Sequence, residues 1–102
     1  MVPRKLEVKV RFFTSLREIL GKREITLTFA EGERVTVDLV LKTLTSKYGK
    51  PFTEYVYDTK TGHPKNFLQF LINGTSASTL NGLETELTEG AVLAILPPVG
   101  GG

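Results

Sequence analysis

The chain has 102 residues, of which 40% are hydrophobic and 24% are charged, and these values are typical of one globular domain. A domain of this size has little interior to spare for an active-site cavity, so we expect a surface or a terminus to be the working part. Thirteen basic and eleven acidic residues give a net charge of +2, and they form neither a basic run nor an aromatic-interleaved basic motif, so we expect no nucleic-acid partner.

The sequence contains no cysteine, which excludes disulfides, thiolate metal sites and a cysteine nucleophile. The N-terminal residues lead into an alternating segment and not into an apolar signal region, and no apolar run approaches membrane-spanning length. We therefore expect a cytoplasmic protein with no membrane partner. No repeat or linker interrupts the chain before its last residues, so we expect a single domain over residues 1–102.

The first half of the chain predicts two strands around a short helix. Leu6, Val8, Val10 and Phe12 alternate with charged residues, as in a half-buried strand. Residues 15–18 have the form of a capping box, and Gly21 is placed to end the short helix that would follow. Residues 25–29 alternate between large apolar side chains and threonine, which predicts a second strand.

The main helix is predicted over Val37–Tyr48. Thr36 is a suitable N-cap, apolar residues follow at helical spacing, and Gly49 stands at the position that ends many helices. Residues 50–66 contain two prolines and mixed polarity, so we expect a loop there with one helical turn around residues 52–57.

The second half predicts two more strands. Residues 67–72 are almost continuously apolar and end at Asn73-Gly74, a pair typical of a tight turn. Residues 75–90 are polar and rich in turn residues. Residues 91–96 are apolar on both sides of the chain, so we expect a central strand covered on both faces. This order predicts an α+β fold in which one sheet packs on one main helix.

The last residues are Pro97, Pro98, Val99 and the three glycines Gly100, Gly101 and Gly102. The prolines stop the strand and fix the direction of exit, whereas the glycines leave a slim and mobile tip. From Pro98 the five residues could span roughly 15 Å when extended, which is enough to enter a narrow channel in another protein. We expect residues 97–102 to be a flexible tail. A disordered terminus without a role is the alternative interpretation.

The sequence resembles the β-grasp (ubiquitin-like) sulfur carriers, and most closely the MoaD-like small subunit of molybdopterin synthase. The resemblance covers almost the whole chain, and its most specific part is Pro97-Pro98-Val99 followed by Gly101-Gly102. It implies a mixed sheet packed on one main helix, with the first and last strands side by side in the centre. The other matching segments are Val8 to Phe13, Leu16 to Glu18, Gly21, Ile72 to Gly74 and Leu87 to Gly90.

The resemblance also implies a function in biosynthesis of the molybdenum or tungsten cofactor. An E1-like partner would use ATP to adenylate Gly102, and sulfur from a donor protein would then replace AMP to give a thiocarboxylate. The large subunit of the synthase would receive this tail and pass its sulfur to a pterin precursor. The chain itself would bind no cofactor or metal and would not be an enzyme on its own.

The same resemblance implies which residues form the site. Gly102 would carry the sulfur, with Gly101 beside it. Phe13 continues the polar face of the first strand, so it either packs under the short helix or contacts a partner, and the resemblance favours the partner. The residues expected to contact the partner are Phe13, Leu96, Pro97, Pro98, Val99 and Gly100.

Two other functions remain open. A ubiquitin-like modifier would join Gly102 to lysines of other proteins after the same adenylation, and a β-grasp interaction module would have an idle tail. The Pro-Pro-Val stem favours the sulfur carrier.

His63 is expected to be a solvated loop residue, because no second ligand or nucleophile lies near it in the sequence. Asp58, Glu84 and Glu86 are expected to be ordinary surface acids.

Overall fold

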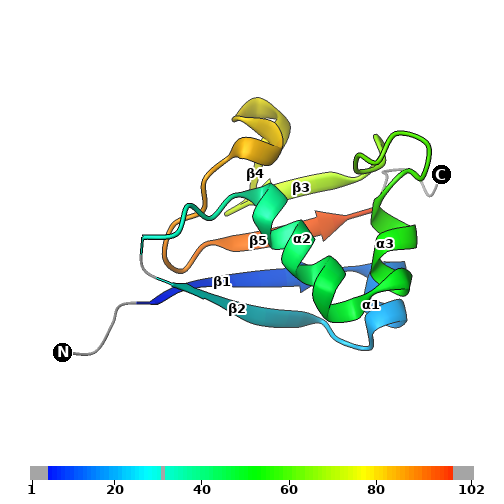
Figure 1. Cartoon of the computed structure of the whole chain (residues 1–102), viewed down its shortest axis with the longest axis horizontal. Coiled ribbons are helices and arrows are strands. Elements are labelled where there is room, and N and C mark those ends of the chain that lie inside the picture. The colour runs from blue at the N-terminus through cyan, green and yellow to red at the C-terminus, as the bar shows by residue number, and fades with distance from the viewer. Residues whose placement is uncertain (1–4, 31, 98–102) are drawn as a thin grey trace.

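A mixed five-stranded sheet in the order β2-β1-β5-β3-β4 carries the helices of this protein (Figure 1). The computed structural model describes residues 5–30 and 32–97. The helix α2 crosses one face of the sheet, with α3 following it on the same side (Figure 1). In chain order the elements are β1 (Lys5–Phe12), α1 (Thr14–Leu20), β2 (Glu24–Ala30), α2 (Val37–Tyr48), α3 (Lys50–Val56), β3 (Gln69–Ile72), β4 (Thr75–Ser76), two 3₁₀ turns (Ala77–Thr79 and Gly82–Glu84) and β5 (Val92–Leu96).

The strands β1 and β5 lie side by side in the centre of the sheet and run parallel, with Phe12 opposite Ile95. On its other edge β1 pairs antiparallel with β2, and β5 pairs antiparallel with β3. This arrangement confirms the prediction that the first and last strands form the centre. The alternation in β1 also confirms the predicted period, because Val8, Val10 and Phe12 are buried while the charged residues between them are exposed.

The core lies between the sheet and α2. Four residues of α2 at helical spacing are fully buried, as the periodicity predicts: Val37, Val40, Leu41 and Leu44. They join the buried residues of β1 and β5 in a single apolar cluster. At the end of α2 the ring of Tyr48 meets that of Phe12 edge to face, with ring centroids 6.2 Å apart. Burial raises the pKa of the Tyr48 phenol.

The second face of β5 is not covered as expected. Leu93 and Ile95 are buried beneath the helices, but Val92, Ala94 and Leu96 on the opposite face are only half-buried. The prediction of two covered faces is therefore wrong. Its physical reason lies in β1, whose Lys9 and Arg11 stand opposite Val92 and Ala94 in the ladder and keep their charges in water.

Helix α3 replaces the predicted loop after Gly49. It spans the seven residues Lys50–Val56 and starts two residues before the single turn that was expected. Pro51 sits in the first turn, where its missing N–H costs no hydrogen bond, so this proline begins a helix and does not break one. Phe52 and Val56, one helical turn apart, are both fully buried and hold α3 on the core.

Helix α1 also starts differently from the prediction. It begins at Thr14, and its N-cap is Phe13, which makes no capping hydrogen bond through its side chain. The capping box at residues 15–18 is therefore wrong, because Ser15 lies inside the helix. Thr14 itself has φ of +45°, a left-handed conformation that is strained for a β-branched residue. Gly21, with φ of +71°, ends the helix as expected.

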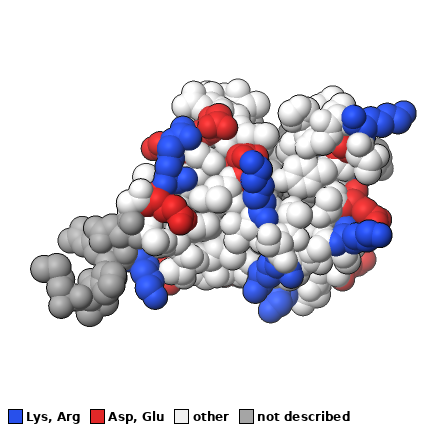
Figure 2. All heavy atoms as spheres, viewed as in Figure 1, with Lys and Arg blue, Asp and Glu red and all other residues white. Residues whose placement is uncertain are grey.

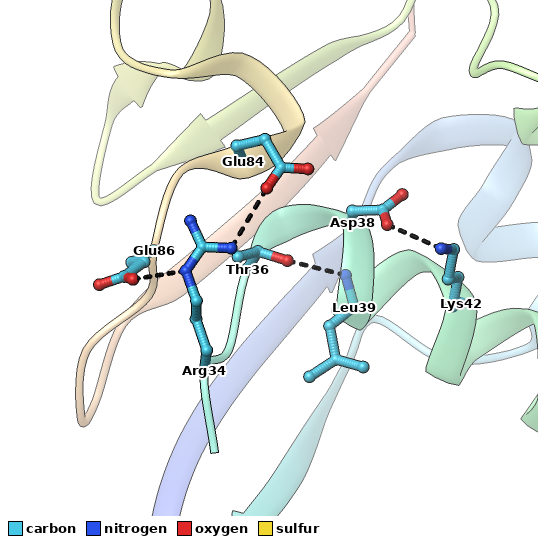
Figure 3. A network of polar contacts seen from close by, with 7 residues as sticks. All are labelled: Arg34, Thr36, Asp38, Leu39, Lys42, Glu84 and Glu86. Carbon is cyan, nitrogen blue, oxygen red and sulfur yellow. Dashed lines mark hydrogen bonds and ion pairs between the residues drawn. The ribbon is translucent and has the colours of Figure 1, made fainter. Parts of the chain in front are cut away.

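The start of α2 is anchored by a polar cluster from the 84–87 segment (Figure 3). Arg34 donates to Glu86 Oε1 at 2.7 Å and to Glu84 Oε2 at 3.2 Å, and these hydrogen bonds raise the pKa of its guanidinium above its ordinary value. Thr36 Oγ1 accepts from the Leu39 amide at 3.1 Å, which confirms the predicted N-cap. The Val37 amide donates to the Thr85 carbonyl, so two of the first amides of α2 are satisfied.

The turn between β3 and β4 is the predicted one. Asn73 and Gly74 both have positive φ, of +51° and +88°, as a type I′ hairpin requires. The amide of Asn73 donates to the Val92 carbonyl, and its Oδ1 accepts from the Val92 amide, each at 2.9 Å. The turn therefore also fixes where β5 begins.

The strain at Thr14 predicts a stabilising substitution. Thr14→Gly should raise the free energy of unfolding by about 1 kcal/mol, because glycine adopts positive φ without the steric cost of a β-branched side chain. Ser15→Gly is the matched control. Ser15 is an exposed residue within α1, so this change should lower stability by about 0.5–1 kcal/mol. Urea unfolding measures both, and a less stable Thr14→Gly protein would show that the local strain is not relieved.

Candidate functional site at the root of the C-terminal tail

The tail leaves the sheet from its central strand. We call Phe13, Leu96 and Pro97 the tail root, since they are the predicted partner-contact residues that the structure describes. Phe13 directly follows Phe12, the ladder partner of Ile95, and so lies level with Leu96. All three residues of the tail root are half-buried. The structure therefore brings them together at the end of the sheet where the chain leaves β5.

The rest of the predicted site lies outside the described residues. This applies to Pro98, Val99, Gly100, Gly101 and Gly102, whose roles stay predictions. The described part of the chain contributes β5, the strand that precedes them in the sequence. β5 is hydrogen-bonded on both sides, to β1 and to β3, so the position and direction of Leu96 are set by two ladders.

Phe13 is held in place but not enclosed. The guanidinium carbon of Arg11 lies 5.6 Å from the centroid of its ring, within the range of a cation–π contact. Arg11 also lies 3.9 Å from Glu24 on β2, and both side chains are about half exposed. Phe13 does not belong to the apolar cluster of the core, and the residue is half-buried.

The sequence reasoning missed one exposed phenylalanine near the tail root. Phe67 was assigned to a buried strand, yet 51% of it is exposed. The assignment is wrong because β3 begins only at Gln69, and the Leu68 amide donates to the Lys65 carbonyl to close a turn. Phe67 thus stands on a turn two residues before Gln69, which pairs with Leu96. Apolar periodicity alone does not distinguish a turn residue of this kind from a strand residue.

One groove of the described chain lies beside β3. It has a volume of about 520 Å³ and runs between residues 63–70 and the two 3₁₀ turns. His63 and Lys65 contribute to one wall, and Ser76 and Ser78 to the other, with their hydroxyl oxygens 2.9 Å apart. Within residues 5–30 and 32–97, no cluster of three histidines or carboxylates that could hold a metal is found.

The charges on the helix-bearing face are of both signs and interspersed (Figure 2). Several are paired, such as Lys42 with Asp38 at 3.0 Å and Arg34 with Glu86 at 2.7 Å. This face therefore does not present a field of a single sign. Among the described residues, no helix is both long and apolar enough to span a membrane.

A mixed sheet with parallel first and last strands at its centre, packed on one main helix, is the β-grasp fold of ubiquitin-like proteins, and its tail leaves from the last strand. The chain belongs to the ThiS family, whose model matches residues 10–102. The fold class predicted from the sequence is thereby confirmed.

Two relatives align with almost the whole chain. The first is the small archaeal modifier protein 3 of Haloferax volcanii, which is 31% identical over 97 residues that cover 95% of this chain and 100% of the relative. The second is named "Putative sulfur carrier protein" in Archaeoglobus fulgidus, and it is 29% identical over the same shares of both chains.

Two solved structures share the fold and a quarter or more of the sequence. The small archaeal modifier protein 1 of Methanosarcina acetivorans has a TM-score of 0.78 and 36% identity, covering 97% of this chain and 99% of its own. A Pyrococcus furiosus protein named "Putative molybdopterin converting factor, subunit 1" has a TM-score of 0.63 and 26% identity, covering 92% and 99%.

The position of β5 predicts that two adjacent residues differ sharply in their effect on stability. Ile95→Ala should lower the free energy of unfolding by about 2–5 kcal/mol, because the side chain is 1% exposed and its removal leaves a cavity. Leu96→Ala, on the open face, should cost less than about 1 kcal/mol. Urea unfolding of the two variants compares them directly. Equal losses would mean that Leu96 is a core residue and not part of an accessible site.

Proposed function

We propose that the chain is a sulfur carrier that works through the carboxylate of Gly102, as the small subunit of a molybdopterin synthase. The observation that carries the proposal is the tail root, because its half-buried residues Phe13, Leu96 and Pro97 stand where the sequence Pro-Pro-Val-Gly-Gly-Gly follows the central strand. The relative named as a sulfur carrier supports the carrier role, and the likeness to a converting-factor subunit supports the pterin pathway.

The proposed chemistry begins with a poor electrophile. A terminal carboxyl group with a pKa of about 3.5 is ionised at neutral pH, so it must be activated before sulfur can be added. An oxygen of the Gly102 carboxylate attacks the α-phosphorus of ATP, and pyrophosphate leaves. Hydrosulfide (HS⁻) supplied by a donor protein then attacks the acyl carbon, AMP leaves with the bonding electron pair, and the thioacid loses its proton. The product is a thiocarboxylate, whose sulfur the large synthase subunit would transfer to its pterin substrate.

The described structure supplies orientation for this chemistry. Two ladders hold β5, and Pro97 follows it directly, so the tail starts at a fixed place relative to Phe13 and Leu96. A partner that binds these residues would receive the tail in one direction. In this proposal the acids, bases and metal ions needed for adenylation and transfer belong to the partners: the E1-like enzyme, the sulfur donor protein and the large synthase subunit.

A second candidate function is protein modification. The names of two similar proteins favour it, since both are called small archaeal modifier proteins. The same acyl adenylate would then be attacked by a lysine amine of another protein, directly or after transfer to an enzyme thiol, and an isopeptide bond to Gly102 would form. The two functions share their first step and differ in the nucleophile that follows.

Intact mass spectrometry of the protein from its own host tests the two functions. Replacement of one carboxylate oxygen by sulfur identifies a sulfur carrier, whereas isopeptide-linked peptides that end in the glycine tail identify a modifier. A protein that carries neither change, in cells that are making the pterin cofactor, would contradict both.

Deletion of Gly102 should abolish adenylation and sulfur transfer, because the reactive carboxylate moves back along its channel, and about 1 Å of displacement already costs on the order of a hundredfold in rate. The free energy of unfolding should hardly change, since truncation of a free terminal backbone is generally tolerated. The measurements are thermal unfolding and ATP-dependent thiocarboxylate formation. Gly101→Val should also fold but transfer poorly, because a branched side chain widens the tip. A truncated protein that still accepts sulfur would contradict the C-terminal mechanism.

Substitutions at the tail root should weaken partner binding and leave the fold intact. Phe13→Ala and Leu96→Ala are each expected to cost about 1–3 kcal/mol in binding to the large synthase subunit, as anchors at an interface do. Calorimetric titration measures the affinity, and circular dichroism checks the fold. Unchanged affinity in both variants would remove these residues from the interface.

A further inference from the structure

We propose that two copies of this chain associate through β2, whose free edge pairs antiparallel with its own counterpart in the second copy. The two sheets then join into one continuous sheet about a two-fold axis at Leu27. This dimer goes beyond the proposed function and does not depend on it, because β1 separates β2 from the strand that carries the tail.

The two edges of the sheet are protected very differently. β4 is an edge of two residues, Thr75–Ser76, and an edge this short offers almost no ladder to another strand. β2 is an edge of seven residues, Glu24–Ala30, and lies at the border of the sheet with β1 on its inner side (Figure 1). Its sequence contains neither lysine nor proline, the residues that commonly keep an edge strand from pairing. The edge of β2 is therefore open to a further strand.

Alternate residues of β2 direct their backbone groups to this free edge. The Phe12 amide donates to the Arg23 carbonyl at 2.8 Å, so these residues form a hydrogen-bonded pair at the end of the β1–β2 ladder. In an antiparallel ladder such pairs alternate with pairs whose N–H and C=O groups point outward. The outward-directed residues of β2 are therefore Glu24, Thr26, Thr28 and Ala30. The Ala30 carbonyl also accepts from the Glu33 amide at 3.2 Å, and a carbonyl oxygen can accept a second hydrogen bond.

The strand β2 is complementary to itself in one antiparallel register. In this register Leu27 stands opposite Leu27 of the second copy, and Thr26 stands opposite Thr28. Glu24 then stands opposite Ala30, so each outward-directed residue meets another one. A two-fold axis makes every contact twice, as in the isologous interfaces of most homodimers. This symmetry favours a second copy of the chain over an unrelated strand.

The apolar residues of β2 fit the same register. Ile25 is half-buried on the helix-bearing side of the sheet, where Leu27 and Phe29 are 8% exposed. The pairing sets Ile25 beside Phe29 of the second copy, and a β-branched side chain opposite an aromatic one is a favourable pair across strands. The dimer would thus cover the part of Ile25 that the single chain leaves in water.

The charges on the open face of the sheet also fit. Lys5 stands opposite Ala30 in the β1–β2 ladder, so Lys5 of the second copy would face Glu24 across the small Ala30 side chain. The two backbones lie about 10 Å apart there, twice the spacing of neighbouring strands, and extended lysine and glutamate side chains bridge that distance. Glu24 is the acid between Lys9 and Arg11 of its own copy, at 3.4 Å and 3.9 Å. All these side chains are solvent-accessible, so the charges select the register more than they strengthen the dimer.

The middle of the strand repeats this complementarity. Lys9 stands opposite Thr26 in the ladder, and Glu7 stands opposite Thr28. Since Thr26 meets Thr28 of the second copy, Lys9 of one copy and Glu7 of the other lie in one row with two short threonines between them. The row therefore ends in opposite charges, once on each side of the axis.

A shift of the pairing by two residues loses the fit in either direction. One shift sets Glu24 opposite Thr28, so that Glu7 of the second copy becomes the like charge across from it. It also aligns Lys9 with Lys9, and it leaves the outward groups of Ala30 without a strand partner. The other shift aligns Glu7 with Glu7 and leaves the outward groups of Glu24 unpaired. The register centred on Leu27 satisfies the backbone and the charges together.

The dimer would leave both tail roots accessible. The tail root lies where β1 ends, which is level with the start of the antiparallel β2. A two-fold axis in the middle of β2 therefore sends the two tail roots to opposite ends of the joined sheet. An edge of seven residues covers less surface than the roughly 1,200–2,000 Å² of a standard interface, so we expect a weak dimer that depends on protein concentration.

The backbone part of the interface is tested by Thr28→Pro. Proline removes an outward amide and is tolerated at an edge position whose N–H faces solvent, so thermal unfolding should show a folded protein. Because the two-fold axis removes the same hydrogen bond twice, the Kd of the dimer should rise by about tenfold or more. Thr28→Ala is the matched control, since it retains the amide and should change the Kd much less. Sedimentation equilibrium of the full chain, up to roughly 1 mM protein, measures the Kd.

The charge part of the interface is tested by Lys5→Glu. This change sets a second acid across from Glu24, so it should weaken the dimer, and high salt should reduce the difference from the wild type. Lys60→Glu makes the same change in net charge at an exposed residue between α3 and β3, and should leave the Kd unchanged.

The register is tested with introduced cysteines, because the chain has none of its own. Thr26→Cys and Thr28→Cys are single changes at exposed positions of β2. In the proposed register the two positions form a hydrogen-bonded pair with Cα atoms about 5.5 Å apart, within reach of a disulfide. An oxidised mixture of the two variants should therefore give the mixed dimer. Each variant alone has its two cysteines on a diagonal, roughly 7–8 Å apart, and should not crosslink.

A mixed disulfide, together with a dimer that Thr28→Pro weakens, would support the pairing of β2 with itself. A wild-type chain that stays monomeric up to roughly 1 mM would overturn the inference, as would a dimer that a folded Thr28→Pro protein forms equally well. Crosslinking of Thr26→Cys with itself in place of the mixed dimer would overturn the register centred on Leu27. None of these outcomes bears on the proposed function, which is measured by the loading of Gly102.

Discussion

The parallel pairing of β1 with β5 is the constraint on which the rest of the structure depends. It joins the two ends of the chain in the centre of the sheet, and α2 covers one side of the pair with its four fully buried residues. A parallel pair needs a long crossover between its strands, and here nearly the whole chain serves as that crossover. The pairing therefore closes only when the intervening helices and strands are in place.

This constraint also creates the candidate site. Because β5 is bonded on both edges, the residue that follows it leaves the sheet at a fixed point, between the end of β1 and the start of β3. In the proposed function this small domain presents a rigid base for its tail. In this proposal the partners supply the catalytic groups, and the chain holds its tail in position for them.

The open face of the sheet and the turn at Phe67 show where the fold leaves apolar surface in water. Leu96 and Phe67 would contribute more to stability if they were covered, yet the charged residues of β1 keep this face solvated and the turn at Lys65 turns Phe67 outward. In the proposed function, a partner would cover this exposed apolar surface. The buried core lies on the opposite face, under α2.

The sequence predicted an element correctly wherever the contacts that determine it lie close together along the chain. The period-two strands, the helix Val37–Tyr48 with Thr36 as its cap and the Asn73-Gly74 turn could all be predicted, because dihedral preferences and apolar spacing determine them. The start of α1, the helix at Pro51 and the open face of β5 could not, since each depends on what packs beside it. Phe67 shows the reason most clearly. Its apolar neighbours predict a buried strand, but the register of Gln69 with Leu96 decides where that strand begins, and this pairing of distant residues exists only in the folded chain.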